Sequence, residues 1–225
     1  MTSSDATRVD QGGVDAVARR VGASYDVAAD RSAQVAVVCA RFNGGVTLRL
    51  LDGVLDALDQ HGPGSHSAVV AWVPGAFELP LAAQCLARSG TVDAVVALGA
   101  VIRGDTPHFD FVAGPCAEGL SRVALETSVP VVFGVLTTET EAQAFERCGP
   151  GPTNKGYEAA MTALAMVGLL GRLAGRDAAR SAGYGAAQIV GEDAARSAGY
   201  GAAQIAGEAA ARAARSAPAR LGRGG

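Results

Sequence analysis

The residues best suited to chemistry lie together in one short segment, Gly104-Asp105-Thr106-Pro107-His108. A Gly-Asp-Thr turn offers free backbone N–H groups and a hydroxyl, which suit a phosphate. A histidine beside a bound phosphate can transfer protons near neutral pH. The segment therefore predicts a phosphate-binding turn with His108 as its proton shuttle. The alternative is that His108 is an ordinary loop residue.

The turn follows a run of small and branched apolar residues, 94–101, which reads as a buried parallel strand. An amphipathic stretch, residues 111–126, comes after it and predicts a helix. In open α/β sheets, ligands bind outside the carboxyl ends of the strands. The turn with His108 therefore lies where such a fold forms its ligand site.

The same alternation continues along the chain. Strands are predicted at residues 35–39, 68–73, 94–101 and 131–136, and helices at 46–60, 77–89, from about 111, 140–147 and 154–173. Strict alternation of strands and helices indicates a mostly parallel sheet covered by helices on both faces. The predicted fold is a flavodoxin-like three-layer α/β/α sandwich with a mostly parallel four-stranded sheet.

Two other predicted strand ends carry residues suited to a ligand. Phe42 lies in a Gly-rich loop, where a core residue is unexpected but a ring can stack on a flat heterocycle. Pro74 and Gly75 form a tight turn that opens a helix. Glu78, in the first turn of that helix, either caps it or accepts a hydrogen bond from a ligand hydroxyl. After the fourth strand, Thr138 is expected to cap the next helix.

The cations of the chain point to an anionic ligand. Lys155 is the single lysine beside eighteen arginines, and an ammonium is a compact charge that a guanidinium does not replace at a tight site. Arg147 and Lys155 bracket one loop of Gly, Pro and Asn residues. Two cations and a phosphate-suited turn together predict an anionic ligand.

Composition and cysteine spacing argue against nucleic acid, metal and membrane as partners of this protein. The net charge is −3, which gives no reason to expect nucleic acid as a partner. The four cysteines, Cys39, Cys85, Cys116 and Cys148, are far apart and predict free thiols in a reducing cytosol rather than a metal cluster or disulfides. The N-terminus does not resemble a signal peptide, and residues 159–170 are too few to span a bilayer. We expect a cytoplasmic protein with no metal and no membrane partner.

Three segments differ in composition. Residues 1–32 are polar and predict a flexible leader or arm with a weak helical pattern at 14–21, and residues 33–173 form the α/β domain. Residues 174–225 are a low-complexity Ala/Gly/Arg tail, in which residues 177–189 recur unchanged as 193–205, a period of sixteen. Sixteen residues match no standard solenoid unit. Alanine favours helix and the Gly-Tyr-Gly pairs break it, so short helical pieces or disorder are expected. The tail is expected to have no function, and loose binding of a partner is the alternative.

Five motifs, in order, resemble those of the lumazine synthase (6,7-dimethyl-8-ribityllumazine synthase) family. They are Arg-Phe-Asn at 41–43, Trp-Val-Pro-Gly-Ala-Phe-Glu-Leu-Pro at 72–80, Leu-Gly-Ala-Val-Ile-Arg-Gly-Asp-Thr-Pro-His-Phe-Asp at 98–110, Pro-Val-Val-Phe-Gly-Val-Leu-Thr-Thr at 130–138, and Glu-Arg-Cys-Gly with Asn-Lys-Gly at 146–156. The resemblance covers residues 35–173. It implies a transferase-type condensing enzyme of the penultimate step of riboflavin biosynthesis.

The reaction implied by the resemblance joins 5-amino-6-ribitylamino-pyrimidinedione and 3,4-dihydroxy-2-butanone 4-phosphate, and gives the lumazine, phosphate and water. Its proton transfers need no redox cofactor or metal. The family also forms homopentamers and sometimes sixty-subunit shells, so the resemblance implies a pentamer or a pentamer-based shell. An association with riboflavin synthase is a further implication.

The resemblance assigns roles residue by residue. Phe42 would stack on the pyrimidine, and Phe133 would close over the ring from a neighbouring subunit. The ribityl chain and the ring edge would be held by Ala76, Phe77 and Glu78, and the ring would also contact Ala100, Val101 and Ile102.

The remaining roles concern the phosphate and the proton. Asp105 and Thr106 would bind phosphate, largely through backbone N–H groups, and His108 would be the acid–base residue. Arg147 would be the main phosphate cation, with Lys155 nearby.

Two other readings of the chain are a non-catalytic module that binds riboflavin or another flavin, and a shell-forming paralogue. Phe42 and Glu78 would serve the flavin-binding module, whereas a shell-forming paralogue would keep the subunit interfaces and lose catalysis. A flavin site needs no place for a phosphate dianion, however, so the joint presence of His108, Arg147 and Lys155 favours the enzyme.

Overall fold

The sheet of the computed structural model has four strands, all parallel, in the order β2-β1-β3-β4. The structure describes residues 9–21 and 24–175. The strands are β1 (Val35–Ala40), β2 (Val69–Val73), β3 (Ala94–Ile102) and β4 (Val131–Thr138). All four strands lie where the apolar runs predict them, and the predicted α/β class is confirmed.

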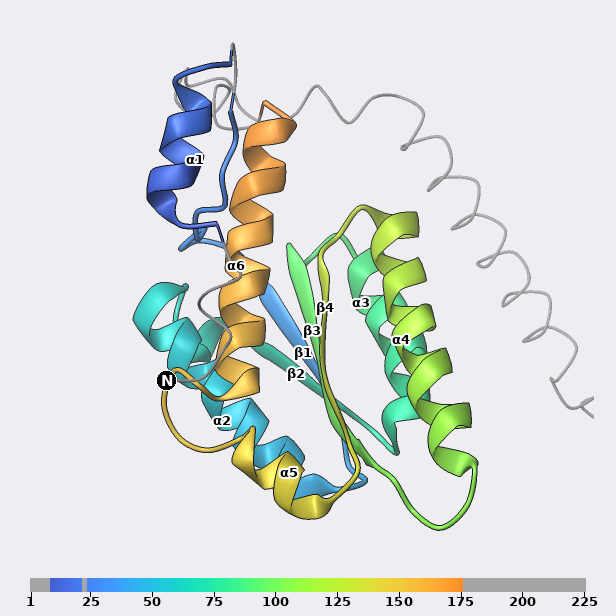
Figure 1. Cartoon of the computed structure of the whole chain (residues 1–225). Coiled ribbons are helices and arrows are strands. Elements are labelled where there is room, and N and C mark those ends of the chain that lie inside the picture. Colours follow the sequence, from blue (N-terminus) through green and yellow to red (C-terminus); the bar gives the residue numbers. More distant parts are fainter. Residues whose placement is uncertain (1–8, 22–23, 176–225) are drawn as a thin grey trace, which may run out of the picture. The chain divides into compact units, whose positions relative to one another are not determined.

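Helices cover both faces of this sheet, which confirms the three-layer prediction (Figure 1). One face carries α3 (Leu79–Arg88) and α4 (His108–Thr127). The other carries α2 (Gly44–His61), α5 (Glu141–Glu146) and α6 (Lys155–Leu173). Two short 3₁₀ turns, η2 (Ser65–Ser67) and η3 (Ala76–Glu78), flank β2.

The central strands explain why the sequence has continuous apolar runs. Every residue of β1 is buried, and alternate side chains enter the two cores on opposite faces of the sheet. Val35, Val37 and Cys39 pack with α2 and α6, whereas Ala36 and Val38 pack with α3 and α4. A strand that is buried on both faces has no polar face, so it reads as an unbroken apolar run.

Two predicted boundaries are wrong at positions near the carboxyl edge. Helix α4 begins at His108 and not near Phe111, because Pro107 (φ −63°) already has the backbone angle of a helix start. Thr137 and Thr138 belong to β4, and Thr140 caps α5 by accepting a hydrogen bond from the Gln143 N–H, 3.2 Å. His108 is therefore a helix residue.

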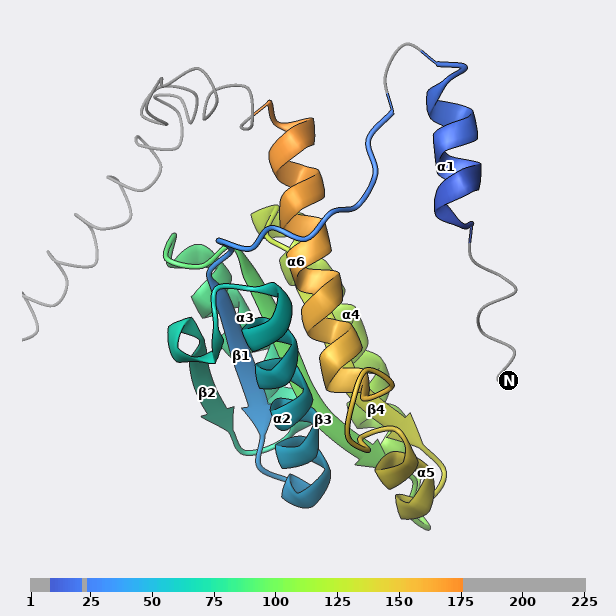
Figure 2. The ribbon, with the colours of Figure 1, turned by 90° about the vertical axis from the view of Figure 1, so that its left-hand side faces the viewer.

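The segment before β1 contains a helix, α1 (Gln11–Ala18), which has no buried residue. It begins three residues before the weak helical pattern at 14–21. Further along, the chain follows α6 (Figure 2), and the Asp30 N–H donates to the carbonyl of Leu164, 3.0 Å. The domain boundaries at 32 and 173 stay predictions, and the repeat tail from 176 lies outside the described residues.

All four cysteines are free thiols, as predicted. Cys85 is exposed, and the other three are buried. Burial raises the pKa of the Cys39 thiol to about 12 and that of Cys116 to about 11, so both stay protonated at neutral pH. Within residues 9–21 and 24–175, no helix is long and apolar enough to cross a membrane, and no group of His, Cys, Asp and Glu residues could hold a metal ion.

Helices α2 and α6 approach each other closely at Gly156, in the first turn of α6. A Cβ atom there would overlap the carbonyl oxygen of Leu50 in α2. Beside it, buried Asn154 accepts a hydrogen bond from the Gly156 N–H (2.7 Å) and donates to the Arg49 carbonyl (2.9 Å). The start of α6 is therefore fixed against the middle of α2.

We expect Gly156→Ala to lower the free energy of unfolding by about 1–3 kcal/mol, because the added methyl group forces the two helices apart. Gly114→Ala is the matched control: it also lies in a helix, and its Cβ would meet nothing within 4 Å. Chemical denaturation at one fixed protein concentration measures both. Equal stability of the two variants would contradict the close approach.

Candidate functional site

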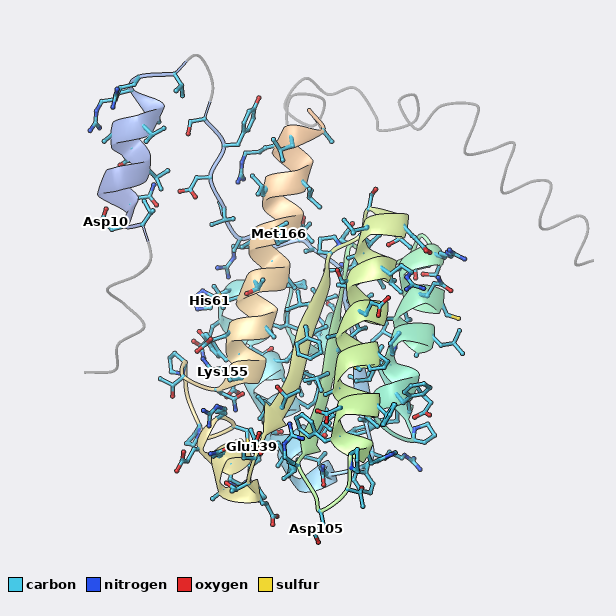
Figure 3. The ribbon with its side chains drawn as sticks, turned by 45° about the vertical axis from the view of Figure 1, so that its right-hand side comes forward. Asp10, His61, Asp105, Glu139, Lys155 and Met166 are labelled. Atoms are coloured by element: carbon cyan, nitrogen blue, oxygen red, sulfur yellow. The ribbon has the colours of Figure 1, made fainter. Side chains whose placement is uncertain are left out.

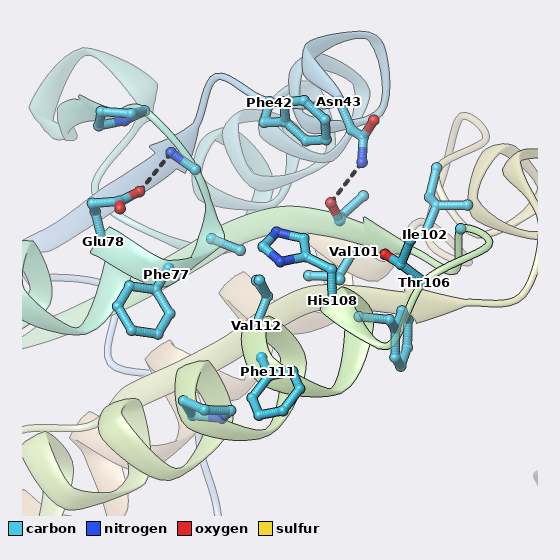
Figure 4. Close-up of a pocket in the computed structure, with 17 residues that line it drawn as sticks. Phe42, Asn43, Phe77, Glu78, Val101, Ile102, Thr106, His108, Phe111 and Val112 are labelled. Carbon is cyan, nitrogen blue, oxygen red and sulfur yellow. Dashed lines mark hydrogen bonds between the residues drawn. The ribbon is translucent and has the colours of Figure 1, made fainter.

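A cavity of about 1000 Å³ opens at the carboxyl edge of the sheet, between η3 and the first turns of α4 (Figure 4). Nine of the residues predicted for the site line it: Phe42, Ala76, Phe77, Glu78, Ala100, Val101, Ile102, Thr106 and His108. The cavity lies where the chain, having added β2 on one side of β1, returns to add β3 on the other. This point of reversal is where open parallel sheets bind ligands.

The floor of the cavity exists because β3 is longer than its neighbour β1. The last register pair between them is Cys39 with Leu98, whereas pairing with β4 continues to Ile102. The Ala100 carbonyl accepts a hydrogen bond from Asn43 Nδ2, 2.8 Å. Backbone groups of alternate residues in a strand point the same way, so those of Ile102 face the cavity unpaired by β1. Such groups can bind the polar edge of a flat ring.

Aromatic side chains form much of the cavity wall. Four of the six phenylalanines of the chain line it, namely Phe42, Phe77, Phe109 and Phe111. The Phe42 ring is 72% exposed, a high fraction for an apolar residue in an ordered loop. Its N–H donates to the Pro74 carbonyl, 3.1 Å, so the ring is held out by backbone contacts. These walls suit a flat apolar or heterocyclic ligand.

Glu78 performs the capping role that was one of its two predicted roles. Its Oε2 accepts a hydrogen bond from the Gly75 N–H, 2.9 Å. Glu78 also lines the cavity (Figure 4), so the carboxylate lone pairs that Gly75 does not use can accept hydrogen bonds from a ligand. A carboxylate in this place accepts hydrogen bonds from hydroxyl groups.

His108 is the first residue of α4, and its ring points into the cavity (Figure 4). Thr106 lines the cavity two residues before it. The N-terminus of a 20-residue helix presents unpaired N–H groups and a partial positive charge, which favour an anion. The arrangement places a group able to transfer protons beside a place suited to phosphate.

Four residues predicted for the site do not line the cavity of their own chain. Asp105 lies at the outer tip of the turn, and Phe133 is 41% exposed on the edge strand β4. Lys155 Nζ pairs with Glu158, 2.8 Å, and Figure 3 shows Lys155 away from the turn with Asp105. Arg147 Nη1 donates to the Gln143 carbonyl, 2.8 Å.

The two cations are nevertheless close to each other in the fold. The Lys155 N–H donates to the Arg147 carbonyl, 2.9 Å, which closes the loop between them. The structure thus brings Arg147 and Lys155 together, but not into the cavity with His108.

Helix α4 lines the cavity with residues that were not predicted from the sequence. Phe111, Val112 and Pro115 follow His108 at spacings of three, four and seven residues, which is one face of a helix. This helical spacing is present in the sequence, but it can be recognised only if the helix is predicted to begin at His108 and not near Phe111. Asn43 and Phe109 are further lining residues that were not predicted, and Pro74, Gly75 and Gly104 line the cavity from turns that were predicted at strand ends.

Comparison with known proteins gives one family. The 6,7-dimethyl-8-ribityllumazine synthase family matches residues 32–171. The chain is also similar to a 6,7-dimethyl-8-ribityllumazine synthase of Edwardsiella ictaluri (strain 93-146), with 56% identity over 145 residues. That stretch covers 64% of this chain and 93% of the relative. The residues that line the cavity all lie within residues 32–171, which the family matches.

We expect Asn43→Ala to lower the free energy of unfolding by about 1–2 kcal/mol, because it removes the bond to the Ala100 carbonyl. Asn43 also has a left-handed backbone (φ 56°), which alanine adopts less readily. Asn43→Gly, measured by the same denaturation experiment, relieves the backbone strain but not the lost hydrogen bond. A stability for Asn43→Ala equal to that of the unchanged protein would show that this bond does not hold the loop.

Proposed function

The chain belongs to the 6,7-dimethyl-8-ribityllumazine synthase family, and on this premise we propose that the cavity at the carboxyl edge is its active site. The chain is an α/β enzyme of riboflavin biosynthesis. It condenses 5-amino-6-ribitylamino-pyrimidinedione with 3,4-dihydroxy-2-butanone 4-phosphate. One observation supports this assignment. A single cavity brings together aromatic walls, the end of β3 that β1 does not pair, and a histidine at the N-terminus of a helix.

The pyrimidinedione binds on the strand side of the cavity. Phe42 stacks on its ring, and residues 100–102 contact the ring edge, with the free backbone groups at Ile102. Ala76, Phe77 and Glu78 hold the ribityl chain, whose hydroxyl groups suit the Glu78 carboxylate. The support is that all of these residues line the cavity and that the end of β3 is unpaired by β1.

The butanone phosphate binds at the turn before α4. Backbone N–H groups at Asp105 and Thr106 bind its phosphate, together with the positive end of the α4 dipole. His108 transfers protons as the amine and the ketone form an imine with loss of water, as phosphate is eliminated, and as the second ring closes with loss of a second water. Holding the two substrates side by side supplies much of the remaining acceleration.

Phe133, Arg147 and Lys155 complete the site from a neighbouring subunit. None of the three lines the cavity of its own chain, and a phosphate dianion calls for cations. A contact between unlike surfaces closes into a ring, so we propose a homopentamer or a pentamer-based shell. Edge strand β2 exposes Val69, Val70 and Trp72, apolar residues that a neighbour would cover.

A cytoplasmic location and an association with riboflavin synthase remain part of the proposal. The free thiols of Cys39, Cys85, Cys116 and Cys148 support a reducing compartment. For the association with riboflavin synthase, the support is the shared pathway alone.

We expect His108→Ala to lower turnover by about ten- to a thousandfold with little effect on stability, because it removes a proton shuttle whose ring is exposed. Formation of the lumazine from both substrates, followed by absorbance, measures this. His66→Ala, which changes an exposed histidine outside the cavity, is the control. Unchanged turnover of His108→Ala would refute its role. An unmodified chain that binds flavin but forms no lumazine would favour the non-catalytic reading.

We expect Arg147→Ala to raise the KM for the butanone phosphate at least about tenfold and to leave that for the pyrimidinedione nearly unchanged, because a guanidinium binds phosphate bidentately. Lys155→Arg should give a smaller defect of the same kind, since a guanidinium replaces a point charge poorly. Steady-state kinetics with each substrate varied in turn decide this. Equal losses for both substrates would make Arg147 structural.

We expect light scattering to give at least five chains of 22.5 kDa per particle. When His108→Ala and Arg147→Ala chains are assembled together, about a quarter of the random pairings should restore a complete shared site. Activity in the mixed rings above that of either variant alone therefore tests sharing between subunits. A fully active monomer would contradict the shared site.

A further inference from the structure

The turn between β3 and α4 has few contacts of its own. Residues 103–108 are exposed, and the helix cap Pro107 offers no side-chain hydrogen bond to α4. Within the part of the chain that the structure describes, the side chains of Asp105 and Thr106 make no hydrogen bond, and a Cβ on Gly104 would meet nothing within 4 Å. Yet this turn carries the proposed phosphate-binding N–H groups and ends at His108.

Arg103, directly before the turn, contacts three groups around it with one guanidinium. Nε pairs with Glu139, 2.9 Å, at the junction between β4 and α5. Nη2 pairs with Asp110, 3.4 Å, in the first turn of α4. The guanidinium carbon lies 4.0 Å from the centre of the Phe109 ring, and Phe109 lines the cavity. The side chain therefore connects the start of the turn to its end.

The backbone of Arg103 is held as firmly as its side chain. Its N–H donates to the Thr138 carbonyl, 2.9 Å, and so continues the pairing of β3 with β4 past Ile102. Glu139, the partner of the guanidinium, is the next residue, and its N–H donates to Gln143 Oε1, 2.9 Å, in α5. We call Arg103 and Glu139 together the Arg103 clamp. The backbone of Arg103 attaches it to the sheet, and the Arg103 guanidinium reaches Asp110 in α4.

We propose that Arg103 is a positioning residue of this active site: with Glu139 it holds the turn 104–107 and the first turn of α4, and thereby fixes His108 against the bound phosphate. The proposal rests on the proposed function. The side chains of Arg103, Asp110 and Glu139 are 37%, 64% and 62% exposed, so these ion pairs contribute little to stability. Their effect is on geometry, and the geometry they set is that of His108.

The residue type at position 103 matters for the same reason. A guanidinium is planar, so it can lie on the Phe109 ring while its edge pairs with two carboxylates. The hydrogen bond to Glu139, followed by that to Asp110, raises the pKa of Arg103 above its ordinary value, so it stays charged. A lysine keeps the charge but cannot make the three contacts at once.

The kinetic test compares Arg103→Lys and Glu139→Gln with Arg88→Ala. The Arg88–Glu126 pair, 3.2 Å, ties α3 to the far end of α4 with similar exposure and is the matched control. We expect both clamp variants to lower kcat by about ten- to a hundredfold, since small displacements of reacting groups cost that much. The KM for the butanone phosphate should rise, and that for the pyrimidinedione should stay within about twofold. Arg88→Ala should match the unmodified protein.

A spectroscopic test does not depend on turnover. The chain has three histidines, His61, His66 and His108, so ring resonances of histidine-labelled protein can be assigned by substitution. We expect Arg103→Lys and Glu139→Gln to move the His108 resonance while those of His61 and His66 stay in place. His61, at the end of α2, lies away from the clamp and serves as an internal reference. Its Nε2 is hydrogen-bonded to the Tyr157 hydroxyl, 2.8 Å.

The two tests together separate the proposals. If the unmodified protein forms no lumazine, the proposed function fails, and the His108 resonance still reports whether Arg103 holds this residue. If the protein is active, an unmoved His108 resonance, an unchanged kcat in both clamp variants, or an equal loss in Arg88→Ala overturns the positioning role.

Discussion

The site depends on one constraint, the unequal pairing of β3 with its two neighbours. Strand β3 pairs with β4 to its last residue, Ile102, but its pairing with β1 ends at Leu98. Equal strand ends would pair the backbone of residues 100–102 on both sides and leave no polar edge for a ligand. The unequal ends expose that edge at the carboxyl side of the sheet, beside the Phe42 loop. Asn43 uses one of the freed carbonyl groups, that of Ala100, to fix this loop. The floor and the aromatic wall of the cavity therefore have a common origin.

The two ends of the cavity differ in how they are built. On the strand side, Ala100 and Val101 are buried residues of a rigid sheet, and they define the shape that a flat ring must fit. On the other side, His108 lies in an exposed turn and helix start, which few contacts hold. This division suits a reaction in which the ring is held still while the other substrate loses phosphate and changes shape. The Arg103 clamp connects the turn before α4, which carries His108 at its end, to the sheet.

The distribution of charge supports the proposal that neighbouring chains share the site. In the described residues, the cavity wall contains no lysine or arginine, although the proposed substrate is a phosphate dianion. A helix N-terminus contributes about 0.3–1 kcal/mol toward binding an anion when exposed, much less than a paired cation in a closed site. Arg147 and Lys155 lie side by side elsewhere, with exposed side chains. A neighbouring chain that brings this pair to the cavity would supply the missing charge.

The positions of the strands and most of the residues that line the cavity could be predicted from the amino-acid sequence. Runs such as 94–101 are apolar throughout because burial on both faces of a parallel sheet leaves no polar side, so their positions could be read directly. Phe42, Glu78 and His108 were found because strand ends meet at one edge in any such sheet. The contacts between residues far apart in the sequence are known only from the tertiary structure. Asp105 points outward, and Arg147 and Lys155 lie away from the cavity. Glu139 meets Arg103 across 36 positions, because only the pairing of β3 with β4 brings them together.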